Sequence, residues 1–454
     1  MKILMTGATG LIGKSLGQKL VEQGHALVVI SRDKIKAQRE LPYPAKVIEW
    51  DLMKNPLPLE AFKEVEVVIH LLGETVDGRW TDSKKRKILE SRQVSSKNLL
   101  LHLPLSVHTV ISAAAQGIYG DRGDETLTEE SAAGDGFLAE VCKVWEEPFL
   151  NLQKKSKNQR VVILRIGLVL TSRGGALAKL ISLFQKNLGA SLGSGLQWMS
   201  WISLRDLVDV FISAVENKKY EGVVNAVQPQ PVQNKDFTKS LCQVLNVLQL
   251  PSVPSLVLKT LLGEMAALVL GSLKVEPRRL VSWGFVFRDT ELEKFFATEL
   301  ASFQNGERLF YDEQYLKADI EKVFKFFADA GNLEKITPPL LKFHVKKVSS
   351  VDIEKGTLID YDLKIHGVPA KWRTLIEVWE PPFRFVDTQL KGPYQKWHHT
   401  HSFRKFGEGT LMIDEVRYRL PLGALGRMVA GSFVESDVGQ IFDYRRQIIA
   451  EQKF

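Results

Sequence analysis

The stretch TGATGLIG, Thr6–Gly13, decides the fold of this chain. It follows a short apolar run and precedes a segment with helical spacing, so its glycines fall where a strand turns into a helix. The spacing of Gly7, Gly10 and Gly13 permits a tight turn, a close approach of backbone amides to a pyrophosphate and close helix packing. A phosphate is favoured at such a helix N-terminus. The alternative is a glycine-rich turn without a ligand.

The flanking residues complete a βαβ unit. A helix is predicted over Lys14–Gln23, ending at Gly24, and a second buried strand over Ala26–Ile30. After this unit, predicted strands and helices continue to alternate along the chain. This indicates an α/β fold, a Rossmann-type doubly wound parallel sheet. The further predicted strands are Val47–Trp50, Val65–Leu72 and Val107–Ala113, with a long helix over Asp82–Leu101.

The residues after the second strand indicate which dinucleotide is bound. An acidic side chain there would bond the ribose 2′-hydroxyl, but the chain has Ser31 and Arg32, which suit a 2′-phosphate. NADP is therefore predicted in preference to NAD. Arg32 as an ordinary surface arginine beside Asp33 and Lys34 is the alternative.

Length and composition limit the remaining possibilities. The 454 residues predict two or three domains, and no apolar run reaches the ~18 residues of a membrane span. Leu256–Leu270 is predicted as a buried helix. The net charge of +8 is scattered, so nucleic acid is not expected as a partner. Two separated cysteines, Cys142 and Cys242, and no room for a signal peptide before the first strand predict a reducing, cytoplasmic location.

Several motifs in one order carry a family resemblance: the LLGE loop, GIYG at Gly117–Gly120, LRIGLVL at Leu164–Leu170 and GSGLQWMSWI at Gly193–Ile202. With the glycine motif they resemble the extended short-chain dehydrogenase/reductase superfamily, most closely its atypical epimerase-like subgroup. Pro251–Phe287, with GEMA, PRRL and GFVF, resembles that subgroup's C-terminal module, of the DUF1731 type. The resemblance covers roughly the first 300 residues.

The glycine turn, the strand ends and the LLGE loop are where this family would hold its cofactor. His70, on the fourth strand, is instead expected to be a packed core histidine. The expected cofactor-binding residues are Gly7, Thr9, Gly10, Leu11, Ile12, Gly13, Ser31, Arg32, Asp51, Leu52, Leu72, Gly73, Glu74, Arg79, Ser112 and Arg165.

The chain departs from the superfamily in its catalytic residues. The usual proton donor is a Tyr four residues before a Lys, with a Ser helper, and no Tyr-x-x-x-Lys occurs here. By register, Leu138 and Cys142 occupy the two positions, and the strand end reads Ala113–Gln116 without the serine. Tyr119 and Lys143 are the replacement candidates, with a structural role as the alternative for Tyr119.

Substrate contacts are expected from Gly174–Gly175, from the Gln197–Trp201 segment and from the Pro251–Phe287 module, which together would cap the sheet. The predicted substrate-binding residues are Gln197, Trp198 and Trp201. The two tryptophans could stack on a ligand, and their burial under the cap is the alternative.

Composition changes after a polar break at Leu300–Glu307. A strand, a helix, a run of antiparallel strands and a final long helix predict an α+β domain in which a curved sheet wraps one helix. The predicted strands are Leu309–Leu316, Phe343–Val351, Leu358–Ile365, Lys371–Trp379, Arg384–Leu390, His398–Arg404 and Thr410–Arg419, and the predicted helices are Ile320–Ala328 and Val429–Glu451.

This order, with the motifs NLEKITPP, EPPFRFVD, GPYQKWHHTHSF and DEVRYRLPLG, resembles the START-like helix-grip superfamily, also called SRPBCC. That resemblance implies an apolar cavity for a hydrophobic ligand. Within it, His399 and His401 would share one strand face and His398 the other, with no carboxylate at ligand spacing. Histidines that line a pocket or surface are therefore expected, and no metal.

The sequence thus predicts a domain similar to the extended short-chain dehydrogenases/reductases over residues 1–300 and a helix-grip domain over 307–454. The predicted function is an NADP-dependent oxidoreductase or epimerase-like enzyme for a hydroxyl or carbonyl substrate, sugar-nucleotide-like by analogy. The alternatives are a non-catalytic NADP-binding sensor or scaffold, to which cell-division-related names of some relatives point, and a carrier of hydrophobic ligands. Small molecules are the expected partners, and a homodimer is left open.

Overall fold

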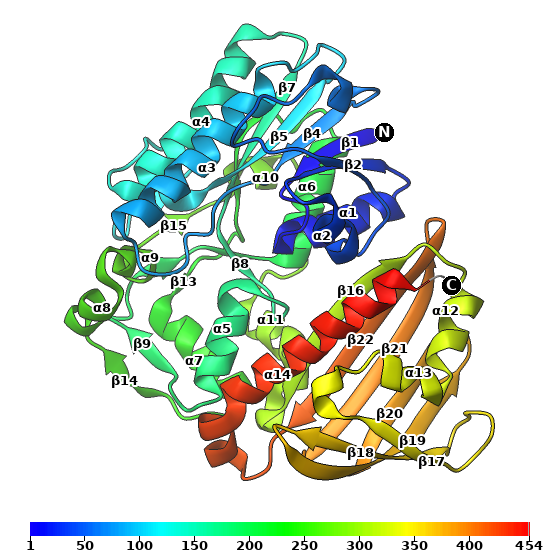
Figure 1. The fold of residues 1–454 in the computed structure, drawn as a ribbon. Helices are drawn as coiled ribbons and strands as arrows, with labels where there is room; N and C mark the ends of the chain where they lie inside the picture. The colour runs from blue at the N-terminus through cyan, green and yellow to red at the C-terminus, as the bar shows by residue number, and fades with distance from the viewer. Residues whose placement is uncertain (453) are drawn as a thin grey trace. The chain divides into compact units, whose positions relative to one another are not determined.

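The computed structural model describes residues 1–452 and 454, and the chain divides into two compact units (Figure 1). The first comprises Met1–Ala37 and Ala45–Glu299; the second comprises Leu300–Phe454 with Gln38–Pro44. No helix in the described part of the chain is long and apolar enough to cross a membrane.

A seven-stranded parallel sheet forms the centre of the first unit, in the order β12-β7-β5-β4-β1-β2-β3. Its strands are nearly continuous runs of buried apolar residues, as expected for a sheet covered on both faces. The bounds are β1 Lys2–Thr6, β2 Ala26–Ser31, β3 Lys46–Glu49, β4 Val67–His70, β5 Thr109–Ala115, β7 Arg160–Ile166 and β12 Gly222–Ala226.

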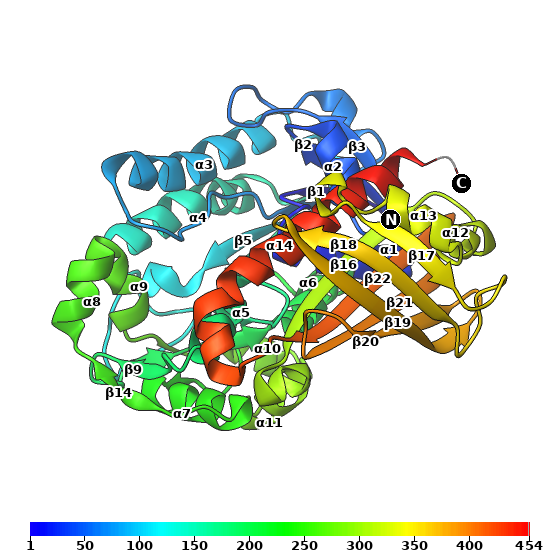
Figure 2. The ribbon, with the colours of Figure 1, turned by 60° about the horizontal axis from the view of Figure 1, so that its bottom comes forward.

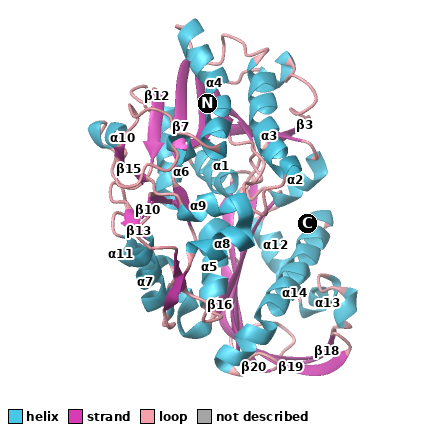
Figure 3. Cartoon of the chain, turned by 90° about the vertical axis from the view of Figure 1, so that its left-hand side faces the viewer, coloured by secondary structure: helices cyan, strands magenta, loops and turns pink. Residues whose placement is uncertain are grey.

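Helices cover both faces of this sheet (Figure 3). The connection through α1 runs from β1 to β2, whereas that through α3 runs from β4 to β5 in the opposite direction along the sheet. Because such crossovers are right-handed, the two helices lie on opposite faces. The helices of the first unit are α1 Leu11–Glu22, α2 Lys34–Glu40, α3 Asp82–Leu100, α4 Phe137–Lys155, α5 Gly175–Phe184, α6 Leu204–Glu216, α7 Asn234–Leu245, α8 Ser255–Leu262, α9 Ala267–Leu270, α10 Arg278–Ser282 and α11 Leu292–Glu299.

Short strand pairs carry the segments outside the main sheet. The motif Leu164–Leu170 spans two strands, because the first strand ends before Gly167, where a Cβ would lie 2.7 Å from Val227 and 2.9 Å from the Ser200 carbonyl oxygen. The pairs are β8 Leu168–Leu170 with β11 Trp201–Ser203, β9 Ala190–Leu192 with β14 Leu250–Val253, β10 Trp198–Met199 with β13 Val232–Gln233, and β6 Thr126–Leu127 with β15 Lys274–Val275.

The prediction of one buried helix over Leu256–Leu270 is wrong. The segment forms α8, a 3-10 turn at Gly263–Ala266 and α9, because Gly263 takes a positive φ of 61° that ends the first helix. Leu256 and Leu261 are exposed.

The second unit is a seven-stranded antiparallel sheet with a long C-terminal helix (Figure 2), and this confirms the predicted α+β order. The strand order is β16-β22-β21-β20-β19-β18-β17, so every strand after β16 pairs with the next one along the chain. The bounds are β16 Arg308–Leu316, β17 His344–Val348, β18 Leu358–Ile365, β19 Val368–Glu380, β20 Arg384–Lys391, β21 Lys396–Phe406, β22 Gly409–Arg419, α12 Ile320–Phe327, α13 Ala330–Lys335 and α14 Gly423–Glu451.

Two helices pack against the inner face of this sheet. From α12, Val323 and Phe324 enter an apolar cluster with Phe385 and Phe403, while Phe442 of α14 packs with sheet residues in a second cluster. An apolar core therefore lies between the sheet and the helices, as in a helix-grip fold.

Candidate functional site

The glycine turn between β1 and α1 leaves no room for a side chain at Gly7 or Gly13. A Cβ on Gly7, which has a φ of +69°, would lie 2.7 Å from the Leu71 carbonyl carbon, and one on Gly13 would lie 2.6 Å from the Gly7 carbonyl oxygen. Gly10 is exposed, and α1 begins there without a side-chain cap from any described residue. A tight turn with an accessible helix N-terminus fits a pyrophosphate.

The turn lies at the point where the strand order reverses. β1 pairs with β2 on one side and with β4 on the other, and ligands of open α/β sheets bind in the crevice outside such a switch point. Gly174 lies beside the same turn, since a Cβ on it would lie 3.2 Å from the Leu11 side chain. The expected substrate loop at Gly174–Gly175 therefore borders the phosphate turn.

Polar groups follow the ends of β2 and β4. Arg32 is exposed, and the Ser31 hydroxyl donates to the Asp33 carbonyl oxygen over 3.0 Å. Lys84 donates to Glu74 over 2.6 Å, which lowers the pKa of that carboxyl, and Arg32 is among the cations that add to the shift. The positive charge of Arg32 thus helps to stabilise the ionised form of Glu74.

Other predicted cofactor residues differ in exposure. Arg79 is exposed, whereas Leu52 and Ser112 are buried, the Ser112 hydroxyl donating to the Ala113 carbonyl oxygen over 3.0 Å. Gly73 is exposed as well, and the half-buried ones are Thr9, Leu11, Ile12, Asp51 and Leu72. Their contact with a cofactor stays a prediction.

His70 is a core residue, fully buried on β4. Its Nδ1 lies 2.8 Å from Thr6 Oγ1, and its Nε2 lies 3.3 Å from the hydroxyls of both Ser95 and Ser96. Burial lowers the pKa of His70 to about 3, so the ring is neutral at every physiological pH.

The first unit should therefore lose stability in mild acid through His70. The unfolded histidine binds a proton near pH 6.5 and the native one only near pH 3, so the contribution is present above pH 6.5 and is lost as the pH falls. Between pH 7 and 5 the loss is about 2 kcal/mol. Urea unfolding of the wild type and His70→Gln at both pH values measures it. His102→Gln, an exposed histidine, should keep the wild-type difference; an equal pH effect in His70→Gln would contradict the assignment.

Leu138 and Cys142 occupy the helix positions that face the end of β5. A Cβ on Gly117, just past this strand, would lie 3.4 Å from Leu138 Cβ and 3.7 Å from Cys142 Sγ. Burial raises the pKa of the Cys142 thiol to about 12. Neither side chain can therefore exchange a proton near neutral pH.

Tyr119 belongs to a buried polar network. It is fully buried, donates its hydroxyl proton to Asn225 over 2.7 Å and accepts from Arg165 over 3.0 Å, while Arg165 forms a two-point ion pair with Glu146 at 2.9 and 2.8 Å. Burial also raises the pKa of Tyr119. This environment favours the structural alternative for Tyr119, and a cofactor contact by Arg165 stays a prediction. Nothing in the sequence pattern pointed to Glu146 or Asn225.

Lys143 lies on the outer side of α4. It is exposed and donates to the Gly134 carbonyl oxygen over 2.8 Å. This partner belongs to the backbone, and a catalytic role for Lys143 stays a prediction.

The predicted substrate-binding residues all make contacts with other residues of the protein. Gln197 donates to the carbonyl oxygens of Leu192 and Val269, both over 3.0 Å. Trp201 is fully buried, with its ring 5.4 Å from that of Phe295, which favours the alternative of burial, and a substrate contact stays a prediction. Trp198 is half-buried and donates to Asp124 over 2.7 Å.

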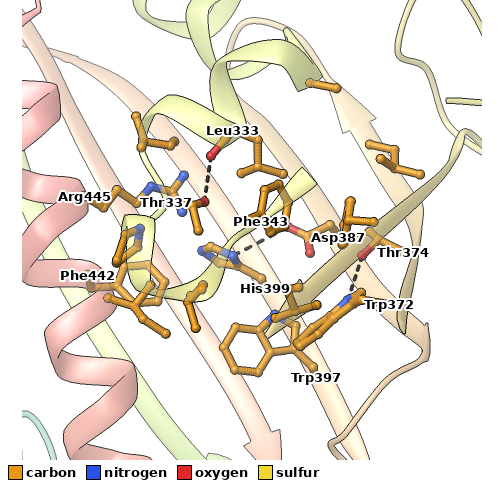
Figure 4. Close-up of a pocket in the computed structure, with 18 of the residues that line it drawn as sticks. Leu333, Thr337, Phe343, Trp372, Thr374, Asp387, Trp397, His399, Phe442 and Arg445 are labelled. Carbon is orange, nitrogen blue, oxygen red and sulfur yellow. Dashed lines mark hydrogen bonds and ion pairs between the residues drawn. The ribbon is translucent and has the colours of Figure 1, made fainter. Parts of the chain in front are cut away.

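The second unit encloses a cavity of about 670 Å³ between the sheet and α14. Most of its lining is apolar or aromatic, and Figure 4 shows Trp372, Trp397 and Phe442 around it. Such a volume and lining suit a hydrophobic ligand with few polar groups.

Polar groups gather at one wall of this cavity. His399 and His401 of β21 lie with Asp387 of β20, and the Arg445 side chain of α14 enters from the opposite side (Figure 4). Asp387 pairs directly with His399, and His401 pairs directly with Asp414 of β22. The expectation that no carboxylate would join the histidines is wrong, because strand pairing supplies both carboxylates; the antiparallel register was the signal that would have predicted them.

In this cluster His399, His401 and Asp414 are buried, and Asp387 is half-buried. Burial lowers the pKa of His399 to about 4. For Asp414 burial opposes ionisation, but Arg445 and the two histidines hold the pKa of the carboxyl well below its usual range.

Comparison with known proteins relates the first unit to named families. A model of the NAD dependent epimerase/dehydratase family matches residues 3–226, and one of the DUF1731 domain of unknown function matches 253–298. An epimerase family protein SDR39U1 homolog of Arabidopsis thaliana, named chloroplastic, is 39% identical over 300 residues, which are 63% of this chain and 83% of the relative. The chain belongs to the epimerase family.

Further members of the epimerase family support the assignment. YfhF of Bacillus subtilis is 33% identical over 298 residues, 64% of this chain and 96% of the relative. The human family member SDR39U1, crystallised with NADPH, is 26% identical with a TM-score of 0.59 and covers 66% of this chain and 99% of its own. A nucleoside-diphosphate sugar epimerase of Corynebacterium glutamicum is 34% identical with a TM-score of 0.53 and covers 66% of this chain and 58% of its own.

The second unit matches a different model. The family described as polyketide cyclase / dehydrase and lipid transport matches residues 316–443. The predicted fusion of an atypical extended short-chain dehydrogenase/reductase domain, with its DUF1731 module, to an SRPBCC domain is thus confirmed.

Proposed function

We propose that the first unit binds NADP(H) and uses it on a hydroxyl or carbonyl substrate. The observation that carries the proposal is the tight glycine turn at Gly7–Gly13, where Gly7 and Gly13 leave no space for a Cβ, beside the switch point of the sheet. Its backbone amides would hold the pyrophosphate, and Ser31 and Arg32 would hold the 2′-phosphate. A human family member crystallised with NADPH supports the same choice of cofactor.

Bound NADP(H) supplies hydride chemistry. The proton that accompanies it needs a donor other than Leu138 and Cys142, which by sequence register occupy the positions of the superfamily's Tyr and Lys. A sugar-nucleotide-like substrate is proposed by analogy with the nucleoside-diphosphate sugar epimerase to which the chain is similar.

The preference for NADP is tested by ligand-dependent thermal unfolding of the wild type and Arg32→Ala. At about 100 times its dissociation constant, NADPH should stabilise the wild type by about 2.7 kcal/mol. Arg32→Ala should bind NADPH at least ~10-fold more weakly, through loss of a charge-assisted phosphate contact worth about 1.5 kcal/mol or more. Lys34→Ala removes an exposed cation nearby and should behave as wild type. Equal stabilisation of the wild type by NADH would contradict the preference.

Leu138 and Cys142 also favour a second candidate, an NADP-binding sensor or scaffold without turnover. The two candidates differ in turnover. Steady oxidation of NADPH with any member of a carbonyl-substrate panel, or epimerisation of a nucleoside-diphosphate sugar without net oxidation of the cofactor, requires the enzyme, whereas binding of NADPH with neither reaction supports the sensor.

The second unit is proposed to hold a hydrophobic ligand in its 670 Å³ cavity. Because Trp372 and Trp397 line the cavity, filling it should change their fluorescence. Organic extraction of the purified protein, followed by mass spectrometry, identifies a ligand that is carried through purification.

The homodimer and the cytoplasmic location stay predictions. The two cysteines are buried, unpaired thiols, which supports a reducing compartment.

A further inference from the structure

The cavity wall of the second unit holds two histidines between two carboxylates. Asp387 Oδ2 lies 3.1 Å from His401 Nε2 and 3.6 Å from His399 Nδ1. On the far side of both rings, Asp414 Oδ1 lies 3.0 Å from His399 Nε2 and 2.7 Å from His401 Nδ1. Each imidazole therefore faces a carboxylate oxygen with both of its nitrogens.

Hydrogen bonds account for one nitrogen of each ring. His399 Nε2 bonds Asp414 over 3.0 Å, and His401 Nε2 bonds Asp387 over 3.1 Å. The other two nitrogens face carboxylate oxygens without a hydrogen bond: His399 Nδ1 lies 3.6 Å from Asp387 Oδ2, and the buried His401 Nδ1 has no hydrogen-bond partner among the described residues. A ring nitrogen that faces a carboxylate in a buried site without a bonded proton is unfavourable unless a cation lies between the two.

The distances match the ligand spacing of a small divalent ion. One ligand atom each from Asp387, His399 and His401 lie within 4.8 Å of one another. With metal–ligand bonds of 2.0–2.1 Å, two ligands of a tetrahedral ion are about 3.3 Å apart. The two distances from Asp387 Oδ2, 3.1 and 3.6 Å, lie on either side of that value.

We infer that Asp387, His399 and His401 bind one divalent transition-metal ion on the wall of the cavity. Asp414 then acts as a positioning residue: it bonds His399 Nε2 and lies 2.7 Å from His401 Nδ1, so it can orient the nitrogens opposite the ion, as carboxylates behind metal-bound histidines commonly do. The sheet makes the site rigid, since direct pairing places Asp387 beside His399 and Asp414 beside His401.

The donor set and its exposure define the class of ion and ligand. Two imidazoles and one carboxylate suit Zn²⁺ or Fe²⁺. All three side chains line the cavity, whereas Asp414 is not among the lining residues, so an ion held by the three would have a coordination position open to the apolar space. Figure 4 shows Asp387 and His399 at this wall. A ligand that combines a hydrophobic body with an oxygen donor, such as a carbonyl or carboxylate, fits both features.

Titration of the tag-free, chelator-treated full chain with Co²⁺, followed by visible absorption and competition with Zn²⁺, tests the inference. One Co²⁺ per chain is expected, with ligand-field bands that Zn²⁺ abolishes. Asp387→Asn and His401→Gln should weaken binding by at least ~100-fold through loss of a ligand, and Asp414→Asn by about 10- to 100-fold. His398→Gln, on the opposite face of the same strand, should bind like the wild type.

Circular dichroism shows whether each variant folds. Asp387→Asn preserves size and shape, so it keeps the test decisive should His401→Gln unfold. If the wild-type protein does not bind Co²⁺ stoichiometrically, the inference is overturned, and the cluster is then held together by hydrogen bonds alone. Equal Co²⁺ affinity in the wild type and a folded ligand variant would also overturn it, because the ion would then lie elsewhere.

Discussion

Replacing Glu146 with alanine is expected to destabilise the first unit by about 3 to 5 kcal/mol, because it leaves the Arg165 guanidinium buried without its counter-charge. The two side chains are 1% and 10% exposed and form a two-point ion pair. Urea denaturation followed by circular dichroism measures the loss of unfolding free energy. Glu147→Ala, the exposed neighbour on the same helix, should change stability by less than about 0.5 kcal/mol.

A second substitution tests the reason for that loss. In Glu146→Ala combined with Arg165→Met, no charge remains unpaired, so the double variant should be more stable than Glu146→Ala alone. If the two losses simply add, the cost comes from removed packing and not from an uncompensated charge.

Replacing Phe324 with alanine is expected to destabilise the second unit by about 3 to 5 kcal/mol through lost burial and a cavity in the core. Its ring lies 5.2 Å from Trp379, 5.9 Å from Phe385 and 5.5 Å from Phe403, which joins α12 to the inner face of the sheet. Urea denaturation measures the loss, and the same titration of Lys322→Ala, an exposed residue of α12, serves as the control.

The apolar nature of the site also predicts a graded response. Phe324→Leu retains most of the buried volume and should lose clearly less stability than Phe324→Ala. Equal losses for the two would mean that the edge-to-face and tilted ring contacts, and not buried volume, dominate at this position.

Local sequence signals determined the two folds. Around Thr6–Gly13, the glycine turn, the buried strands and the helix boundaries depend on residues that are close together in the sequence. In the second sheet, period-2 alternation of apolar residues marked the strands. The sequence also predicted that His70 is a core residue, which its burial confirms, whereas the register of Leu138 and Cys142 came from the family resemblance. Local reasoning failed at Leu256–Leu270, where apolar composition suggested burial but the helix ends at Gly263 and leaves Leu256 and Leu261 exposed.

Only the tertiary structure decided which polar groups meet. Tyr119, Glu146, Arg165 and Asn225 come from four elements, and their pairing depends on strand order, which no spacing along the chain encodes. The same holds for Asp387 and Asp414, which reach the histidines through strand register. Periodicity fixes which face a side chain takes, because it is a property of one strand or helix. Which groups share that face depends on free energies of packing that only the folded chain defines.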